Sequence, residues 1–189
     1  MEEVRELLRK EEVRSISRRY FISNGFDGTL TSIGIIVGAY LSGVSDGVTV
    51  VKIGAGAAVG LATSGVWSVW EIERAEKRAE ILQLERAMLA DLDDTKVQRQ
   101  KVGARKINAV MSGIGPLIGI LFPLVPFLLQ GTYLSLLEAT VVGVGIGVGV
   151  LFAFGAYLGQ LSEQNWFVAG VRMGLAGLVV TFVNFLLPG

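Results

Sequence analysis

Asp27 is the acidic side chain whose place in the sequence most clearly indicates chemistry. It lies near the start of an apolar run that extends from Phe21 to Leu41 and is long enough to cross a bilayer. A carboxylate inside such a run costs about 2.5 kcal/mol or more near the membrane centre, so it usually faces a cavity, a partner or an ion. We therefore predict that Asp27 is a metal ligand. The alternative is a carboxylate near the cytoplasmic surface of the membrane, solvated or paired with Arg18 or Arg19.

Three more carboxylates follow the second apolar run of the chain. Glu73, Glu76 and Glu80 share one face of a helix, because they are spaced by three and four residues. Carboxylate oxygens are the ligands that hard divalent cations prefer, so this face is a second candidate metal site. The alternative is a solvated charged face balanced by neighbouring Lys and Arg side chains.

Hydroxyl side chains within the apolar runs could add oxygen ligands to a pathway. Thr31 lies one turn after Asp27, and Thr63 and Ser64 lie in the second run. Hydroxyls in such positions more often donate to a carbonyl group of their own helix. We retain these three residues as candidate pathway residues.

The composition excludes several kinds of chemistry. The 189 residues include no cysteine and no histidine, which rules out thiolate or imidazole metal sites and Ser-His or Cys-His catalysis. No catalytic constellation is recognisable, so we expect neither an enzyme nor a bound cofactor. Hydrophobic residues make up 51% of the chain and the mean hydropathy is +0.56, values that soluble globular domains do not show. The net charge is zero, and no nucleic-acid partner is expected.

Five segments are apolar over about 20 residues, the length a helix needs to cross roughly 30 Å of hydrocarbon. They are residues 21–43, 49–70, 109–129, 134–158 and 166–187. We therefore predict an all-α integral membrane protein with five transmembrane helices and a lipid bilayer around it.

Positively charged residues predict the orientation of these helices. Six Lys and Arg residues lie in residues 1–20 and nine lie in residues 71–107, whereas the loops between helices 1 and 2 and between helices 3 and 4 have none. The positive-inside rule therefore places an amphipathic N-terminal arm, residues 1–20, and a short helical segment, residues 71–107, in the cytoplasm. The transmembrane parts are then residues 21–70, with helices 1 and 2, and residues 108–189, with helices 3 to 5.

Pairs of glycines four residues apart recur in the first two apolar segments. Gly34 and Gly38 lie in the first segment, and Gly56 and Gly60 lie in the second. This spacing allows helices to approach closely in a membrane. It serves either packing within one subunit or contact between subunits.

Four stretches of the sequence resemble, in order, helices of the vacuolar iron transporter family. Residues 25–32, with the motif Gly-Phe-Asp-Gly-Thr-Leu-Thr-Ser, are similar to the first helix of that family. Residues 119–129, 151–159 and 172–177 are similar to parts of its third, fourth and fifth helices. The resemblance covers most of the predicted membrane part of the chain, and the distribution of Lys and Arg agrees with it.

This resemblance implies a homodimer of five-helix subunits with an ion pathway at the dimer interface. Such proteins export ferrous iron, and sometimes manganese, from the cytosol in exchange for protons. Asp27 takes the position of the family's first-helix aspartate, a ligand on the pathway. Glutamates of a cytoplasmic segment gather the metal, the role that Glu73, Glu76 and Glu80 would have here.

Two departures from the family pattern alter the expected coordination. Phe26 stands where the family has asparagine, and residues 62–67 carry neither the methionine nor the glutamate of the family's second helix, so a soft sulfur ligand is missing. We predict a proton-coupled transporter that moves iron(II) or manganese out of the cytosol across the cell membrane of a prokaryote. The alternative is a non-transporting membrane scaffold of the same fold that binds a partner through its cytoplasmic helices.

Overall fold

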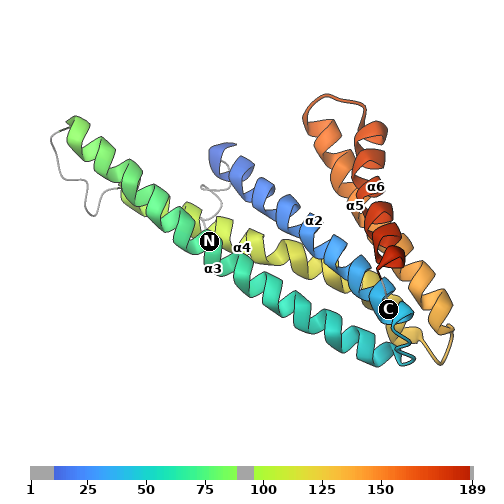
Figure 1. Ribbon diagram of the computed structural model, residues 1–189. Helices are drawn as coiled ribbons and strands as arrows, with labels where there is room; N and C mark the ends of the chain where they lie inside the picture. The colour runs from blue at the N-terminus through green and yellow to red at the C-terminus, as the bar shows by residue number, and fades with distance from the viewer. Residues whose placement is uncertain (1–10, 89–95, 188–189) are drawn as a thin grey trace.

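The protein is represented by a computed structural model that describes residues 11–88 and 96–187, and this part of the chain is mostly helical (Figure 1). Its elements are α2 (Glu11–Leu41), α3 (Gly47–Met88), α4 (Lys96–Leu124), the 3-10 helix η1 (Val125–Leu129), α5 (Leu136–Leu161) and α6 (Trp166–Leu186). The prediction of an all-α protein is confirmed for these residues.

Four stretches of the described chain are long and apolar enough to cross a membrane. They lie in α3, in Val102–Leu129 of α4 and η1, in α5 and in α6. Among the described long helices, α2 does not meet this measure, because polar residues such as Asn24 and Asp27 interrupt its apolar sequence. The chain is thus an integral membrane protein, while the fifth span and the cytoplasmic N-terminus stay predictions.

Helices α2 and α3 both extend beyond the predicted apolar segments. α2 begins at Glu11, within the predicted arm, and continues without a break to Leu41. α3 continues from the apolar segment to Met88, and its far end projects past the start of α2 (Figure 1). The predicted arm and the predicted span are therefore one helix over residues 11–41, and the remainder of the arm lies outside the described residues.

α2 packs closely against α4 because glycines on both helices face the backbone of the other. A Cβ added to Gly28 would lie 2.7 Å from the Cα of Pro116, and one added to Gly115 would lie 2.9 Å from the backbone nitrogen of Gly25. Both distances are too short for a real side chain. Small residues therefore set the spacing between these helices, as is common in membrane bundles.

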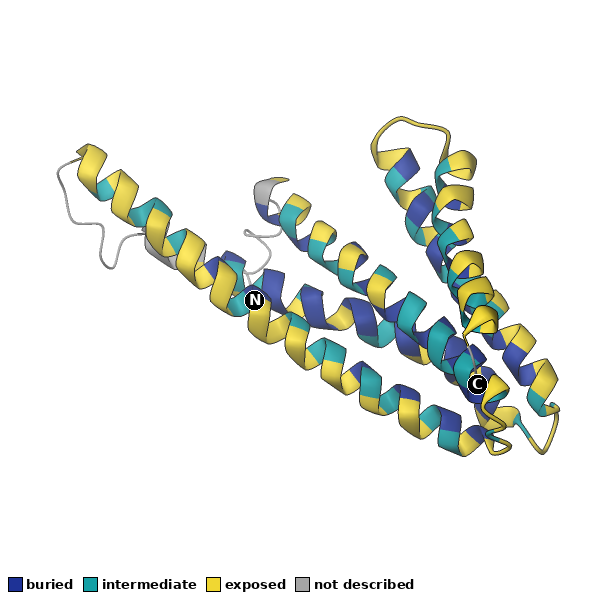
Figure 2. Cartoon of the chain, in the orientation of Figure 1, coloured by how far each residue is buried: buried dark blue, intermediate teal, exposed yellow. Residues whose placement is uncertain are grey.

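Two clusters of buried side chains join the helices. One includes Ile36, Leu124 and Phe127 and connects α2 with α4 and η1. The other includes Ile33 and Leu151 and connects α2 with α5. α2 contacts α3, α4, α5 and α6, so the helix that carries Asp27 touches every other long helix of the described chain, and its buried and exposed residues alternate along it (Figure 2).

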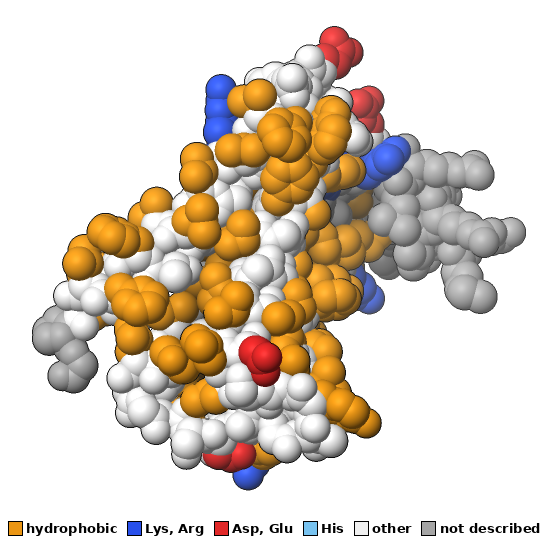
Figure 3. Space-filling view, turned by 90° about the vertical axis from the view of Figure 1, so that its right-hand side faces the viewer, with side chains coloured by type: hydrophobic (Ala, Val, Ile, Leu, Met, Phe, Trp, Pro, Cys, Tyr) orange, Lys and Arg blue, Asp and Glu red, His pale blue; other side chains and the backbone are white. Residues whose placement is uncertain are grey.

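The side of the molecule formed by α5 and α6 is strongly apolar. Figure 3 shows hydrophobic side chains spread over this side with few charged ones among them. On α6 the exposed side chains include Leu178, Val179, Phe182 and Phe185. An apolar surface of this extent fits contact with hydrocarbon and not with water.

Asp46 caps the start of α3. Its carboxylate accepts hydrogen bonds from the backbone nitrogens of Val48, at 3.3 Å, and Thr49, at 3.0 Å. The Thr49 hydroxyl donates a third, at 2.7 Å. The hydrogen bond from the Thr49 hydroxyl contributes most to lowering the pKa of the Asp46 carboxyl below its ordinary value, and the two backbone hydrogen bonds lower it further.

Candidate functional site

A line of polar side chains runs along one exposed face of α2. Arg19, Ser23 and Asp27 are exposed and follow one another at four-residue spacing, and the half-buried Thr31 continues the line. We call these four residues the polar stripe. The structure therefore places Asp27 midway along α2, on the exposed surface of the described chain.

The predicted alternative for Asp27 is a carboxylate that is solvated or paired with Arg18 or Arg19, and of these two the ion pair is not found among the described residues. The Arg19 guanidinium lies 5.7 Å from the centre of the Tyr20 ring instead. An exposed carboxylate that faces lipid is costly, so the polar stripe requires water, an ion or another protein surface against it. In the part of the chain that the structure describes, Asp27 is exposed.

The hydroxyl candidates lie in two different settings. The Thr31 hydroxyl donates to the carbonyl oxygen of Asp27 at 2.8 Å, the local bond that such residues commonly make. The oxygen of that hydroxyl still has a lone pair for a ligand. Thr63 and Ser64 are exposed on α3.

Three hydrogen bonds between α2 and α4 fix the rotation of α2 about its axis. The Ser17 hydroxyl lies 2.6 Å from the Asn108 side-chain oxygen, and the Asn24 amide donates to the Ser112 carbonyl at 3.2 Å. The Ser32 hydroxyl donates to the carbonyl of Ile120 at 3.1 Å. Because these polar groups face α4, the polar stripe on a different side of the helix faces outward.

Glu73, Glu76 and Glu80 do not share one environment, although they lie on one side of α3. Glu73 is 2% exposed, and Glu76 is exposed. Glu80 lies 3.1 Å from the ammonium group of Lys77. The described residues contain no group of three or more acidic side chains that could hold a metal ion, so the structure leaves Asp27 and these glutamates as separate candidates.

Glu73 of α3 lies beside Tyr20 of α2, a pairing between helices that the sequence did not reveal. Burial raises the pKa of the Tyr20 phenol, and the charges of Glu73 and Glu76 raise it further. Arg105 stacks on the Trp70 ring, with its guanidinium carbon 4.1 Å from the ring centre.

Three buried polar atoms of this region lack a hydrogen-bond partner within the described chain. They are Glu73 Oε2, Arg105 Nε and Asn108 Nδ2. Buried polar groups are rarely left unpaired, because each costs free energy when it is removed from water. Glu73 Oε2 is an acceptor that a proton, a water molecule or a cation would satisfy, whereas Arg105 Nε and Asn108 Nδ2 are donors that need an acceptor such as water.

Comparisons with known proteins agree with this architecture. The sequence profile of the VIT family matches residues 71–188, which begin within α3 and include α4, α5 and α6. An uncharacterized protein of Methanocaldococcus jannaschii is 27% identical to this chain over 172 residues, which cover 89% of this chain and 87% of that protein. The second comparison extends over far more of the chain than the family profile, which does not include α2.

Proposed function

The chain belongs to the VIT family of membrane metal-ion transporters, and we propose that it moves iron(II) or manganese(II) out of the cytosol through a pathway between two subunits. The observation that supports this proposal is the polar stripe with Asp27 at its centre, exposed on one subunit of an otherwise apolar protein. In a transporter, the oxygen atoms of such a stripe would bind the transported ion, because an ion within the membrane needs oxygen ligands.

A second copy of this chain, packed against the polar stripe, would best shield the stripe from lipid. In a two-fold dimer each residue near the axis meets its own copy, so two Asp27 side chains would supply four carboxylate oxygens to one ion. α3 also offers an open surface for a partner, since a Cβ added to Gly56 or Gly60 meets nothing within 4 Å. These glycines would allow another helix to approach closely.

Proton exchange follows from this arrangement of carboxylates. Two carboxylates close together repel each other unless a proton or a cation lies between them. Arrival of a metal ion would displace a shared proton, and departure of the ion would restore it. Metal movement in one direction is then linked to proton movement in the other.

The glutamates of α3 are the proposed entry to this pathway from the cytosol. Glu73 supports this role most directly, because its buried Oε2 lacks a partner in the described chain. Glu76 and Glu80 lie one and two turns further along the helix and would collect cations from solution. All these ligands are oxygens, which suit manganese(II) at least as well as iron(II).

Transport can be tested in proteoliposomes loaded with a metal-sensitive dye. Wild-type protein is expected to admit iron(II) and manganese(II), and Asp27→Asn to reduce the rate by about tenfold or more, because one ligand charge per subunit is lost. Glu163→Gln, which removes an exposed charge from the α5–α6 loop, is the matched control and should leave the rate unchanged. Equal rates for wild type and Asp27→Asn would exclude Asp27 from the pathway.

A non-transporting scaffold is the second candidate, and exposed apolar residues on the α3 extension favour it. Leu82, Leu84 and Met88 are all exposed there. Such a scaffold would show no uptake of iron, manganese, cobalt or zinc. It would lose partner binding in Leu82→Ser and be indifferent to Asp27→Asn.

A further inference from the structure

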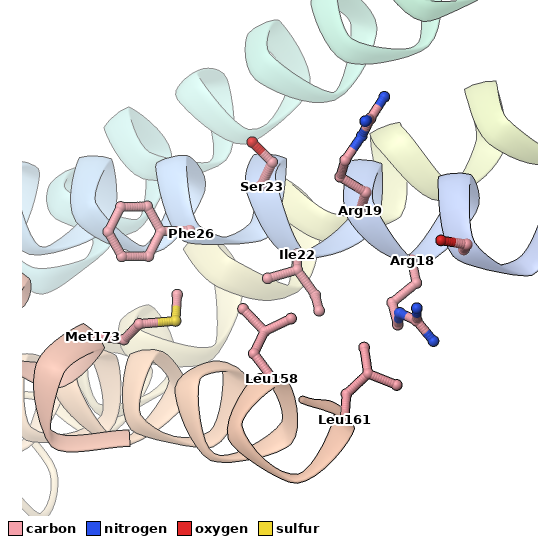
Figure 4. Close-up of a pocket in the computed structure, with 9 residues that line it drawn as sticks. Arg18, Arg19, Ile22, Ser23, Phe26, Leu158, Leu161 and Met173 are labelled. Carbon is pink, nitrogen blue, oxygen red and sulfur yellow. The ribbon is translucent and has the colours of Figure 1, made fainter. Parts of the chain in front are cut away.

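A cavity of about 470 Å³ separates the first half of α2 from α5 and α6. Ile22 and Phe26 of α2, Leu158 and Leu161 of α5 and Met173 of α6 form much of its wall. Figure 4 shows Ile22 directed at Leu158 across this space and Arg18 at the end nearest Leu161. The chamber is therefore apolar along its length and basic at one end.

A second cavity, of about 320 Å³, lies between α2, α4 and α5. Phe21, Met111 and Phe154 contribute apolar walls, and Arg14 is a basic residue of its lining. Arg18 and Ile22 line both cavities. Two apolar chambers thus flank one arginine.

The charge of these linings excludes a metal ion as the natural occupant. Arg14, Arg18 and Arg19 bring three guanidinium groups to the two cavities, and neither lining includes an acidic residue. No ion pair of Arg18 with another described residue is found. A guanidinium binds phosphate well through paired hydrogen bonds, whereas it repels a divalent cation.

We propose that these cavities bind one anionic diacyl phospholipid of the cytoplasmic leaflet. Its phosphate binds Arg18 and Arg14, and one acyl chain enters each of the two apolar chambers. Basic residues at this end of α2 lie on the predicted cytoplasmic side, where anionic lipids attract Lys and Arg. Arg19 and Ser23 of the polar stripe also line the larger cavity, but no lining residue is a proposed metal ligand, so the inference does not depend on metal transport.

Native mass spectrometry of the full chain in a neutral detergent tests the proposal. The probes are dioleoyl phosphatidylglycerol, dioleoyl phosphatidylcholine and soluble glycerol 3-phosphate. Phosphatidylglycerol is expected to stay bound to each subunit, phosphatidylcholine to dissociate, and glycerol 3-phosphate to bind far more weakly because it has no acyl chains. Arg18→Gln should weaken phosphatidylglycerol binding by about tenfold or more, since a charge-assisted contact to phosphate is lost.

Three further variants test the charge of Arg18, the volume of the larger cavity and the specificity of the effect. Arg18→Lys retains the charge and should restore part of the affinity. Leu158→Trp fills the larger chamber without touching an arginine and should also weaken binding. Arg78→Gln removes an exposed arginine from α3 and should change nothing.

Several results would overturn the proposal. Equal retention of the two phospholipids would show that the chambers merely take up lipid without charge selection. Tight binding of glycerol 3-phosphate alone would indicate a phosphate site and not a lipid site. Unchanged binding in both Arg18→Gln and Leu158→Trp, with helical circular dichroism and elution volume preserved, would place any bound lipid elsewhere on the protein.

Discussion

Asn24 on α2 donates a hydrogen bond to the backbone carbonyl oxygen of Ser112 on α4, 3.2 Å away. Its amide nitrogen also contacts the Ser112 hydroxyl. Asp27 lies three residues further along α2, on a side of the helix that is exposed. These contacts between two neutral residues therefore help to hold α2 in the rotation that exposes Asp27.

Loss of this bond should affect both stability and uptake. Asn24→Ala is expected to lower the free energy of unfolding by about 1–2 kcal/mol, because the carbonyl group of the buried Ser112 loses a donor. Uptake should fall as well, since α2 can then rotate and move Asp27. Thermal unfolding in detergent and dye-loaded proteoliposomes measure the two effects. Ser23→Ala, on the exposed stripe, is the control and should leave stability unchanged.

Substitution of the open glycines of α3 tests the subunit contact. Gly56→Leu and Gly60→Leu add side chains where the single subunit has free space, so the subunit itself should fold normally. If a partner helix packs there, the dimer should dissociate and uptake should fall. Light scattering in detergent and proteoliposome uptake measure these outcomes. Gly145→Leu adds the same side chain to open space on α5; a dimer that survives both α3 substitutions would exclude this surface.

Glu73→Gln should separate stability from function. A buried carboxylate with a partnerless oxygen costs free energy, so its neutral isostere is expected to leave the melting temperature unchanged or raise it. Uptake should decrease if Glu73 receives ions or protons. The measurements are thermal unfolding and initial uptake rate, with Glu163→Gln as control. A marked loss of stability would instead show that the charged form of Glu73 has a favourable partner in the folded protein, such as the Tyr20 side chain.

Acid should remove the contribution of Asp46 to stability. Hydrogen bonds lower the pKa of the Asp46 carboxyl in the folded protein. The charged carboxylate therefore stabilises the fold at pH values above 3.8, the pKa of this group in the unfolded chain. That contribution disappears as the pH falls through the lower folded value. Asp46→Ala should therefore melt below wild type at neutral pH, and the difference should vanish at low pH. A difference independent of pH would mean that the Asp46 charge is not what caps α3.

The sequence predicted the helices well and their rotations poorly. Runs of apolar residues and the clustering of Lys and Arg located α3, α5 and α6 and drew attention to Asp27. In a membrane protein, however, residues that face lipid and residues that face the core are both apolar, so periodicity does not show which side is buried. The pairing of Asn24 with Ser112, 88 residues away, has no local signature.

Glu73 illustrates the same limit among the polar residues. Its spacing to Glu76 and Glu80 correctly places the three on one side of a helix. The sequence did not show that Glu73 is buried while Glu76 remains in solvent, because that depends on how α2 and α4 approach α3. The basic cavities beside Arg18 were missed for a similar reason, since three different helices form each lining.

The length of α3 has a mechanical consequence. Its 42 residues form one uninterrupted helix, which at a rise of 1.5 Å per residue is about 63 Å long. A rod of this length acts as a lever, so a slight tilt at Gly47 becomes a displacement of several ångströms at Met88. A movement of the chain before Gly47 would thus be transmitted to the part of α3 that carries Glu73, Glu76 and Glu80, and a movement there would be transmitted back to Gly47.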